Sequence, residues 1–170
     1  ASGAFRKLIE NHGKFPQLDD ALRLCADSQH REKKYQASHD LCVDFLGKYP
    51  DAKQAGDVAF LQSENLFLLE KYEGAAKGFT AFTGKYDSHP QVPAANYRIG
   101  SSHYNQKKWT EALKALEPLV AVKDSPPGFV ELDFMVADCH YWTGAWDQAT
   151  TFYNKFAAEN PKEVKADTAL

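Results

Sequence analysis

Residues 96–113 read NYRIGSSHYNQKKWTEAL, and this stretch is the clearest indication of the fold. It contains an aromatic residue, Trp109, that follows the polar turn 106–108. The residues three, seven and ten positions after Trp109 are Ala112, Leu116 and Leu119, which fall on one face of a helix with 3.6 residues per turn. The stretch therefore predicts two antiparallel helices joined by a turn of the length found in helical hairpins.

The same pattern occurs four times at a fixed period of 37 residues. Equivalent positions hold a bulky aromatic anchor, then a small residue three positions later, and another small residue nine positions before the anchor. Small side chains at both places let two helix backbones approach closely. A fixed period of roughly 20 to 50 residues marks an array in which each unit stacks on its neighbours. The anchors are Tyr35, Tyr72, Trp109 and Trp146, followed by Ser38, Ala75, Ala112 and Ala149 and preceded by Ala26, Ser63, Gly100 and Ala137.

This pattern resembles the tetratricopeptide repeat (TPR) family, most clearly over residues 96–119. The resemblance implies an all-α fold, a right-handed superhelical solenoid of helix-turn-helix repeats within one domain. The first repeat departs most from the family pattern, with Ser38 and Cys42 at helix-contact positions and Gln29 at a position that is usually apolar. The repeats are expected at residues 17–50, 51–90, 91–126 and 127–161.

The ends of the sequence continue the same register. Residues 1–16 are expected to form the second helix of a truncated preceding repeat, and residues 162–170 the start of a further helix. We therefore expect the sequence to be a piece of a longer protein, with apolar end faces that favour end-to-end self-association. The link Lys-Tyr-Pro-Asp at residues 48–51 resembles bacterial envelope TPR proteins, such as the Tol-Pal coordinator and outer-membrane assembly lipoproteins. This resemblance implies the periplasm or cell envelope, while the cytoplasm stays open.

Composition and motifs argue against several functional classes. The net charge of −3 and pI near 6.1 give no basic footprint for nucleic acid. No run of 18 apolar residues predicts a membrane span. The six histidines are dispersed, and neither metal-ligand spacings nor a catalytic motif is present, so we expect no metal, no cofactor and no enzymatic activity. Cys25 and Cys42 would face each other across the first hairpin, either as buried free thiols or as a disulfide; Cys139 is expected in the core.

The expected function is protein–protein interaction. In the TPR family the first helix of each repeat lines a concave groove, and here that register carries rings rimmed by carboxylates. Desolvated aromatic side chains are typical interface hot spots, and carboxylates favour a partner with basic as well as apolar residues. The same rings could instead pack the repeats together, and the array could be a structural spacer or self-association segment with no groove ligand. The predicted contact residues are Phe60, Glu64, Phe67, Tyr97, Tyr104, Phe134, Asp138, Tyr141 and Trp142.

Overall fold

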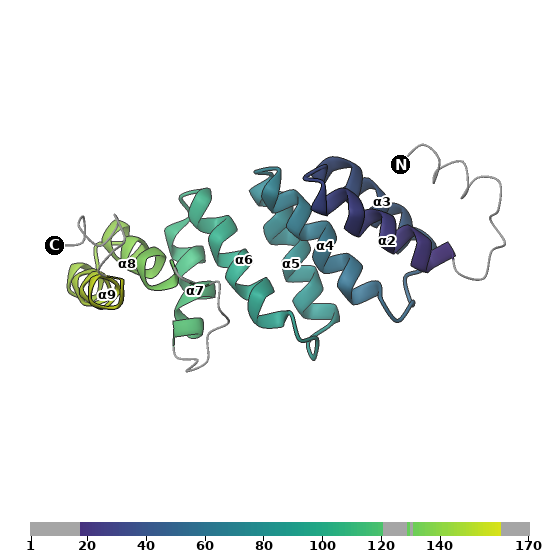
Figure 1. The fold of residues 1–170 in the computed structure, drawn as a ribbon. Helices are drawn as coiled ribbons and strands as arrows, with labels where there is room; N and C mark the ends of the chain where they lie inside the picture. Colours follow the sequence, from purple (N-terminus) through teal and green to yellow (C-terminus); the bar gives the residue numbers. More distant parts are fainter. Residues whose placement is uncertain (1–17, 121–128, 130, 161–170) are drawn as a thin grey trace. The chain divides into compact units, whose positions relative to one another are not determined.

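The computed structural model describes residues 18–120, 129 and 131–160, and these are helical throughout apart from turns and links. The predicted all-α fold of helical hairpins with a 37-residue period is confirmed. The helices expected within 1–16 and 162–170 lie outside the described residues. The described helices are α2 (Leu18–Arg31), α3 (Tyr35–Lys48), α4 (Ala55–Leu68), α5 (Tyr72–Lys85), α6 (Val92–Asn105), α7 (Trp109–Val120), α8 (Leu132–Trp142) and α9 (Trp146–Glu159) (Figure 1).

All four hairpins close through the same turn. In the first, Lys33 has a left-handed φ of 59° and its N–H donates to the His30 carbonyl at 2.8 Å, while the Lys34 N–H donates to the Gln29 carbonyl at 2.9 Å. These two bonds satisfy carbonyls that the end of a helix otherwise leaves unpaired. The left-handed residue recurs every 37 positions, with Glu70 and Lys107 at 59° and Gly144 at 83°.

The chain divides into two compact units, Ala1–His89 and Pro90–Leu170. In the first unit α3 packs against both α2 and α4, and α4 packs against α5. In the second unit α7 packs against both α6 and α8, and α8 packs against α9. Within each unit, every helix therefore contacts mainly the helices next to it in chain order.

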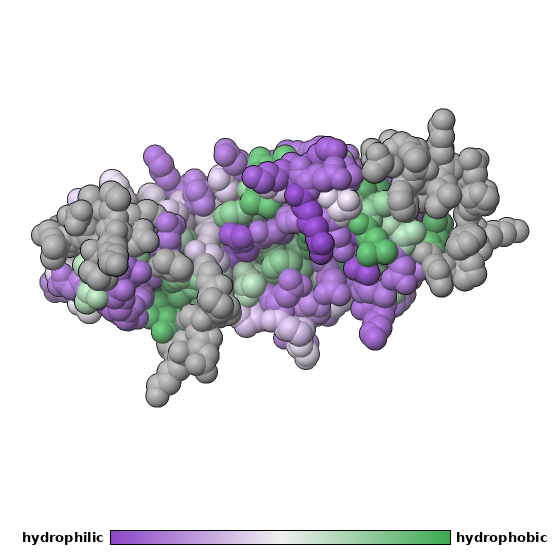
Figure 2. Space-filling view, viewed as in Figure 1, coloured by the Kyte–Doolittle hydropathy of each residue, from purple (hydrophilic) through white to green (hydrophobic). Residues whose placement is uncertain are grey.

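The first helices of successive hairpins form the inner layer of each unit. Helices α2 and α4 contact each other, as do α6 and α8, whereas neither α3 and α5 nor α7 and α9 meet, although all eight are described. The first helices are therefore closer together than the second helices, as on the inner side of a curved stack. Hydrophilic side chains cover most of the described surface in the view of Figure 2, with hydrophobic groups in patches between them.

The small residues of the repeat pattern lie where paired helices approach each other. Ser38, Ala75 and Ala112 are fully buried. A Cβ built on Gly100 of α6 would lie 2.4 Å from the Leu116 side chain of α7, so only glycine fits there. The prediction that these small residues allow close helix packing is thus confirmed.

The three cysteines are free, buried thiols. Burial raises the pKa of Cys42 to about 12 and that of Cys139 to about 12, and it also raises the pKa of Cys25. Of the two arrangements considered for Cys25 and Cys42, the structure has the unbridged one. None of the described helices has the length and apolar character needed to cross a bilayer.

Candidate functional site

The predicted contact residues of the first unit, Phe60, Glu64 and Phe67, lie on α4 and are half-buried. The ring of Phe60 packs edge-on against Phe79 and Phe82 of α5, with centroids 5.2 and 5.6 Å away. Phe67 packs in the same way against Tyr72 at 5.4 Å. Both rings therefore fill the space between α4 and α5 and offer only their remaining edges to a partner.

Two predicted rings of the second unit are also half-buried between helices. Tyr97 of α6 stacks on Phe129 at 4.4 Å, and its hydroxyl donates to the Met135 sulfur at 3.8 Å. Phe134 of α8 packs against Tyr153 and Phe156 of α9, at 5.6 and 5.3 Å. These contacts give Tyr97 and Phe134 a structural role in holding neighbouring helices together.

Asp138 lies at the centre of a hydrogen-bonded group that joins three helices. Its carboxylate on α8 accepts hydrogen bonds from the hydroxyl of Tyr104 on α6 and from that of Tyr153 on α9, the latter at 2.5 Å. Burial, together with the bond to this carboxylate, raises the pKa of both tyrosines well above the usual value. The Asp138 carboxylate is thus engaged within the fold.

The turn between α8 and α9 carries the most exposed aromatic residues of the described chain. Tyr141 is 51% exposed, Trp142 60% and Trp146 68%. Trp142 stacks on Trp109 with centroids 5.8 Å apart and planes inclined by 13°, and it meets Tyr141 edge-on at 5.3 Å. Trp109 in turn contacts Tyr104 at 5.5 Å. We refer to Tyr104, Trp109, Tyr141 and Trp142 as the aromatic cluster.

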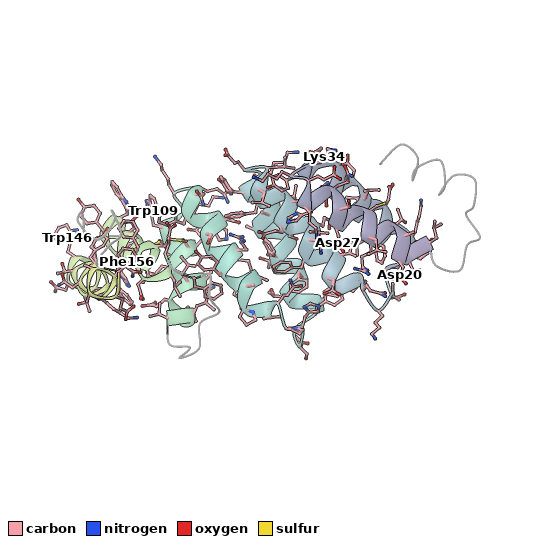
Figure 3. The ribbon with its side chains drawn as sticks, in the orientation of Figure 1. Asp20, Asp27, Lys34, Trp109, Trp146 and Phe156 are labelled. Carbon is pink, nitrogen blue, oxygen red and sulfur yellow. The ribbon has the colours of Figure 1, made fainter. Side chains whose placement is uncertain are left out.

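Sequence reasoning included Tyr104, Tyr141 and Trp142 in the contact set but took Trp109 and Trp146 only as hairpin anchors. The structure shows that Trp109 supports the cluster and that Trp146 stands open at the start of α9 (Figure 3). One signal that could have identified Trp146 was the density of rings around the turn of the fourth hairpin, where Tyr141, Trp142 and Trp146 lie within six residues.

The sequence segment that contains this turn is acidic. Between residues 131 and 154 the chain has no lysine or arginine but four carboxylates, those of Glu131, Asp133, Asp138 and Asp147. Asp133 forms an ion pair with Lys155 at 3.0 Å. Asp147 follows Trp146 directly and is exposed. The segment that carries the exposed rings is therefore acidic, while two exposed lysines, Lys107 and Lys108, precede Trp109, on which Trp142 stacks.

The inner face of the first unit is polar where α2 begins. Arg23 pairs with Asp27 at 3.0 Å, and Gln54 donates to Asp20 at 3.2 Å (Figure 3). Further along, the Asn65 amide donates to Ser38 Oγ at 2.8 Å, while its oxygen lies 2.8 Å from His30 Nδ1. The unusual polar residue Ser38 of the first repeat is thus explained, since it binds a buried asparagine of the next hairpin.

No group of three or more His, Cys, Asp or Glu side chains among the described residues converges on a point where an ion could sit. A pocket of about 280 Å³ on α2 is lined by Leu24, Asp27, Ser28, Arg31 and Glu32, which all belong to one helix and its following turn.

Comparison with known proteins identifies similar repeats. The model of the tetratricopeptide repeat family matches residues 60–128 and 97–164. No curated protein matches the sequence.

Solved structures resemble this chain in fold. The crystal structure of MamA has a TM-score of 0.72 at 14% identity, covering 96% of this chain and 89% of that one. A tetratricopeptide repeat protein from Parabacteroides merdae has a TM-score of 0.73 at 14% identity, where 99% of this chain spans 62% of that chain. BtubC from P. vanneervenii has a TM-score of 0.71 at 12% identity, with 96% and 74% covered. At these identities the likeness concerns the fold alone.

Proposed function

Because the chain belongs to the tetratricopeptide repeat family, we propose that it is a non-enzymatic scaffold that binds a segment of a protein partner on the inner layer of its hairpins. Proteins of this family generally mediate protein–protein interactions and are typically not enzymes. A preformed helical surface loses little conformational freedom when a partner binds, which favours affinity.

The observation that carries this proposal is the exposure of Tyr141 and Trp142 on a rigid support. Trp142 is 60% exposed although it stacks on Trp109, and Tyr141 is 51% exposed although it contacts Trp142. Large rings that are held in place and still open to solvent lose little rotamer entropy on binding and bury much apolar area. Both properties are typical of interface hot spots.

The other predicted residues contribute in a different way under this proposal. Phe60, Phe67, Tyr97 and Phe134 are half-buried and pack helices together, so they shape the surface and offer ring edges to the partner. Asp138 accepts a hydrogen bond from Tyr104, which packs edge-on against Trp109, and so positions the aromatic cluster. Glu64 adds to the acidic character expected to attract a basic partner.

The partner segment that fits this surface combines apolar with basic residues. Apolar groups would cover the rings, and basic groups would be attracted by the net negative charge of residues 131–147. We propose the cell envelope as the compartment on the sequence resemblance of residues 48–51 alone, and none of the comparisons adds to it.

The test uses cross-linking from a defined site. A photoreactive phenylalanine analogue is placed at position 142 or, as a control, at the exposed position 43 on α3. We expect cross-links to a partner from 142 and none from 43. The double variant Tyr141→Ala, Trp142→Ala should lose partner capture while the circular dichroism of its helices is unchanged, whereas Leu24→Ala, Val43→Ala should retain capture. Unchanged capture by the Tyr141, Trp142 double variant would support the alternative, a structural spacer without a groove ligand.

A further inference from the structure

We propose that His140 is a positioning residue for Trp142, and that it acts through a proton-dependent ion pair with Glu117 of the preceding hairpin. This inference rests on the proposed function, because Trp142 is one of the two rings that carry it. It adds a means of regulation to that surface, since the position of Trp142 then depends on whether His140 holds a proton.

The imidazole of His140 is buried without a hydrogen-bond partner. The residue is 6% exposed, and neither of its ring nitrogens meets a donor or an acceptor among the described residues. A buried polar group that lacks a partner is costly, and such groups are rare in folded proteins. The neutral ring therefore leaves two polar atoms unsatisfied where α8 packs between α7 and α9.

Two contacts of this ring favour its protonated form. A carboxylate oxygen of Glu117 on α7 lies 3.6 Å from Nε2, close enough for an ion pair but too far for a hydrogen bond. The ring also stacks on Phe152 of α9, with centroids 5.5 Å apart and planes inclined by 15°. Protonation makes Nε2 a charged donor for the carboxylate, and an aromatic face attracts a cation. Burial opposes the charge, but the Glu117 side chain is 54% exposed and keeps the pair next to water.

Other charged groups of the described residues are engaged elsewhere or absent from the ring. Helices α6, α7 and α9 pack against α8. From α7 the ring meets the Glu117 carboxylate, and from α9 it meets the uncharged Phe152. Asp138, two residues before His140 on α8, accepts the hydroxyls of Tyr104 from α6 and Tyr153 from α9. Glu117 is therefore the group that responds to the charge of His140.

The closing turn of the fourth hairpin connects His140 to Trp142. The His140 carbonyl accepts hydrogen bonds from the Ala145 N–H at 2.9 Å and from the Thr143 hydroxyl at 3.1 Å. Trp142 lies within this turn of chain and stacks on Trp109, which begins α7. The ion pair and the stack thus join the same two helices, so closing the first fixes the helix crossing at which the second is made.

The direction of the pH dependence follows from the pair. Histidine side chains ordinarily change their charge between about pH 5 and about pH 8. At the acidic end of this range the cationic ring attracts the Glu117 carboxylate, and Trp142 is held on Trp109. As the pH rises the ring loses its proton, the attraction is lost, and the indole of Trp142 gains freedom.

The experiment follows the indole N–H signal of Trp142 by NMR in the whole chain, between about pH 5.5 and about pH 8. The signal is assigned with single Trp→Phe variants, and the ring current of Trp109 makes it sensitive to stacking. We expect it to shift across this range in the unmodified chain. Glu117→Gln changes an exposed side chain and keeps its shape, so the fold is retained and most of the shift should be lost. His140→Phe keeps a ring against Phe152 without a charge and should lose the shift as well.

His103 provides the matched control, because it occupies the equivalent position 37 residues earlier. Burial, together with the positive charge of Lys108, lowers the pKa of His103. His103→Phe should leave the pH dependence of Trp142 unchanged. A Trp142 signal that does not move with pH, a shift that persists in Glu117→Gln, or an equal loss of the shift in His103→Phe would each overturn the inference.

These measurements need no partner, so they separate the inference from the proposed function. If the Trp142 signal is insensitive to Glu117→Gln while Tyr141→Ala, Trp142→Ala still abolishes partner capture, the proposed function stands and the role of His140 is refuted.

Discussion

Asp138 accepts hydrogen bonds from two tyrosines that belong to different helices, Tyr104 of α6 and Tyr153 of α9. Its carboxylate therefore fastens the first helix of the third hairpin to both helices of the fourth. A half-buried carboxylate that satisfies two hydroxyl groups is worth more to the fold than an exposed one, because each hydroxyl would otherwise lose its partner on leaving water.

We predict that Asp138→Ala lowers the free energy of unfolding by about 1–3 kcal/mol, since two half-buried hydroxyl groups lose their acceptor. Urea unfolding followed by circular dichroism measures this change. The control is Glu159→Gln, which removes an exposed carboxylate at the end of α9 and should change stability by less than about 0.5 kcal/mol. Equal effects of the two substitutions would mean that the bonds from Tyr104 and Tyr153 add nothing to stability.

At the scale of the helical hairpin, the closing turn requires one residue with left-handed backbone. Three of the four turns place a residue with a Cβ there, Lys33, Glu70 and Lys107, each at a φ of 59°, and only Gly144 avoids the steric cost. That cost is about 1 kcal/mol for a residue other than glycine. The chain therefore contains its own comparison between a strained and an unstrained turn.

We predict that Lys107→Gly raises the free energy of unfolding by about 0.5 kcal/mol and that Gly144→Ala lowers it by about 1 kcal/mol. The opposite signs follow because the first substitution removes a Cβ from a left-handed position, and the second adds one. Both can be measured by urea unfolding, with Lys108→Gly, next to the turn but outside the left-handed position, as the control that should not stabilise. A neutral Gly144→Ala would refute the steric argument.

The hairpins were predictable from the sequence because helix packing imposes a period on it. Helices α3, α5, α7 and α9 begin at the aromatic anchors, and the small residues three positions later are buried. The candidate site was less predictable. A register assigns Tyr97 and Asp138 to the inner face but does not show that Phe129 and Tyr153 come to contact them. The turn of Tyr141 toward Trp142, which leaves Trp146 open, depends on side-chain packing that no periodicity encodes.

Across the whole chain, each of the two units arranges its helices in a nearly one-dimensional series. Within each unit a helix contacts the helices next to it in chain order, and the first helices also meet those of the next hairpin. In such an array stability is approximately a sum over hairpins and the interfaces between neighbours, so a local defect lowers local protection most.

Gly100 allows a test of whether a packing defect lowers protection only locally, because α6 and α7 approach each other closely at this residue. An added Cβ would lie 2.4 Å from Cγ and Cδ2 of Leu116, a fully buried side chain that cannot move aside without displacing its neighbours. We predict that Gly100→Ala lowers the free energy of unfolding by about 1–3 kcal/mol. Amide hydrogens should lose protection from exchange in α6, α7 and α8, while those of α2 and α3 keep theirs.

The matched control is Gly47→Ala in α3, where a Cβ meets nothing within 4 Å and the higher helix propensity of alanine should raise the free energy of unfolding by about 0.5–1 kcal/mol. A uniform loss of protection from α2 to α9 in Gly100→Ala would instead mean that the hairpins unfold as one cooperative body, because the defect would then be felt far beyond the helices that touch it.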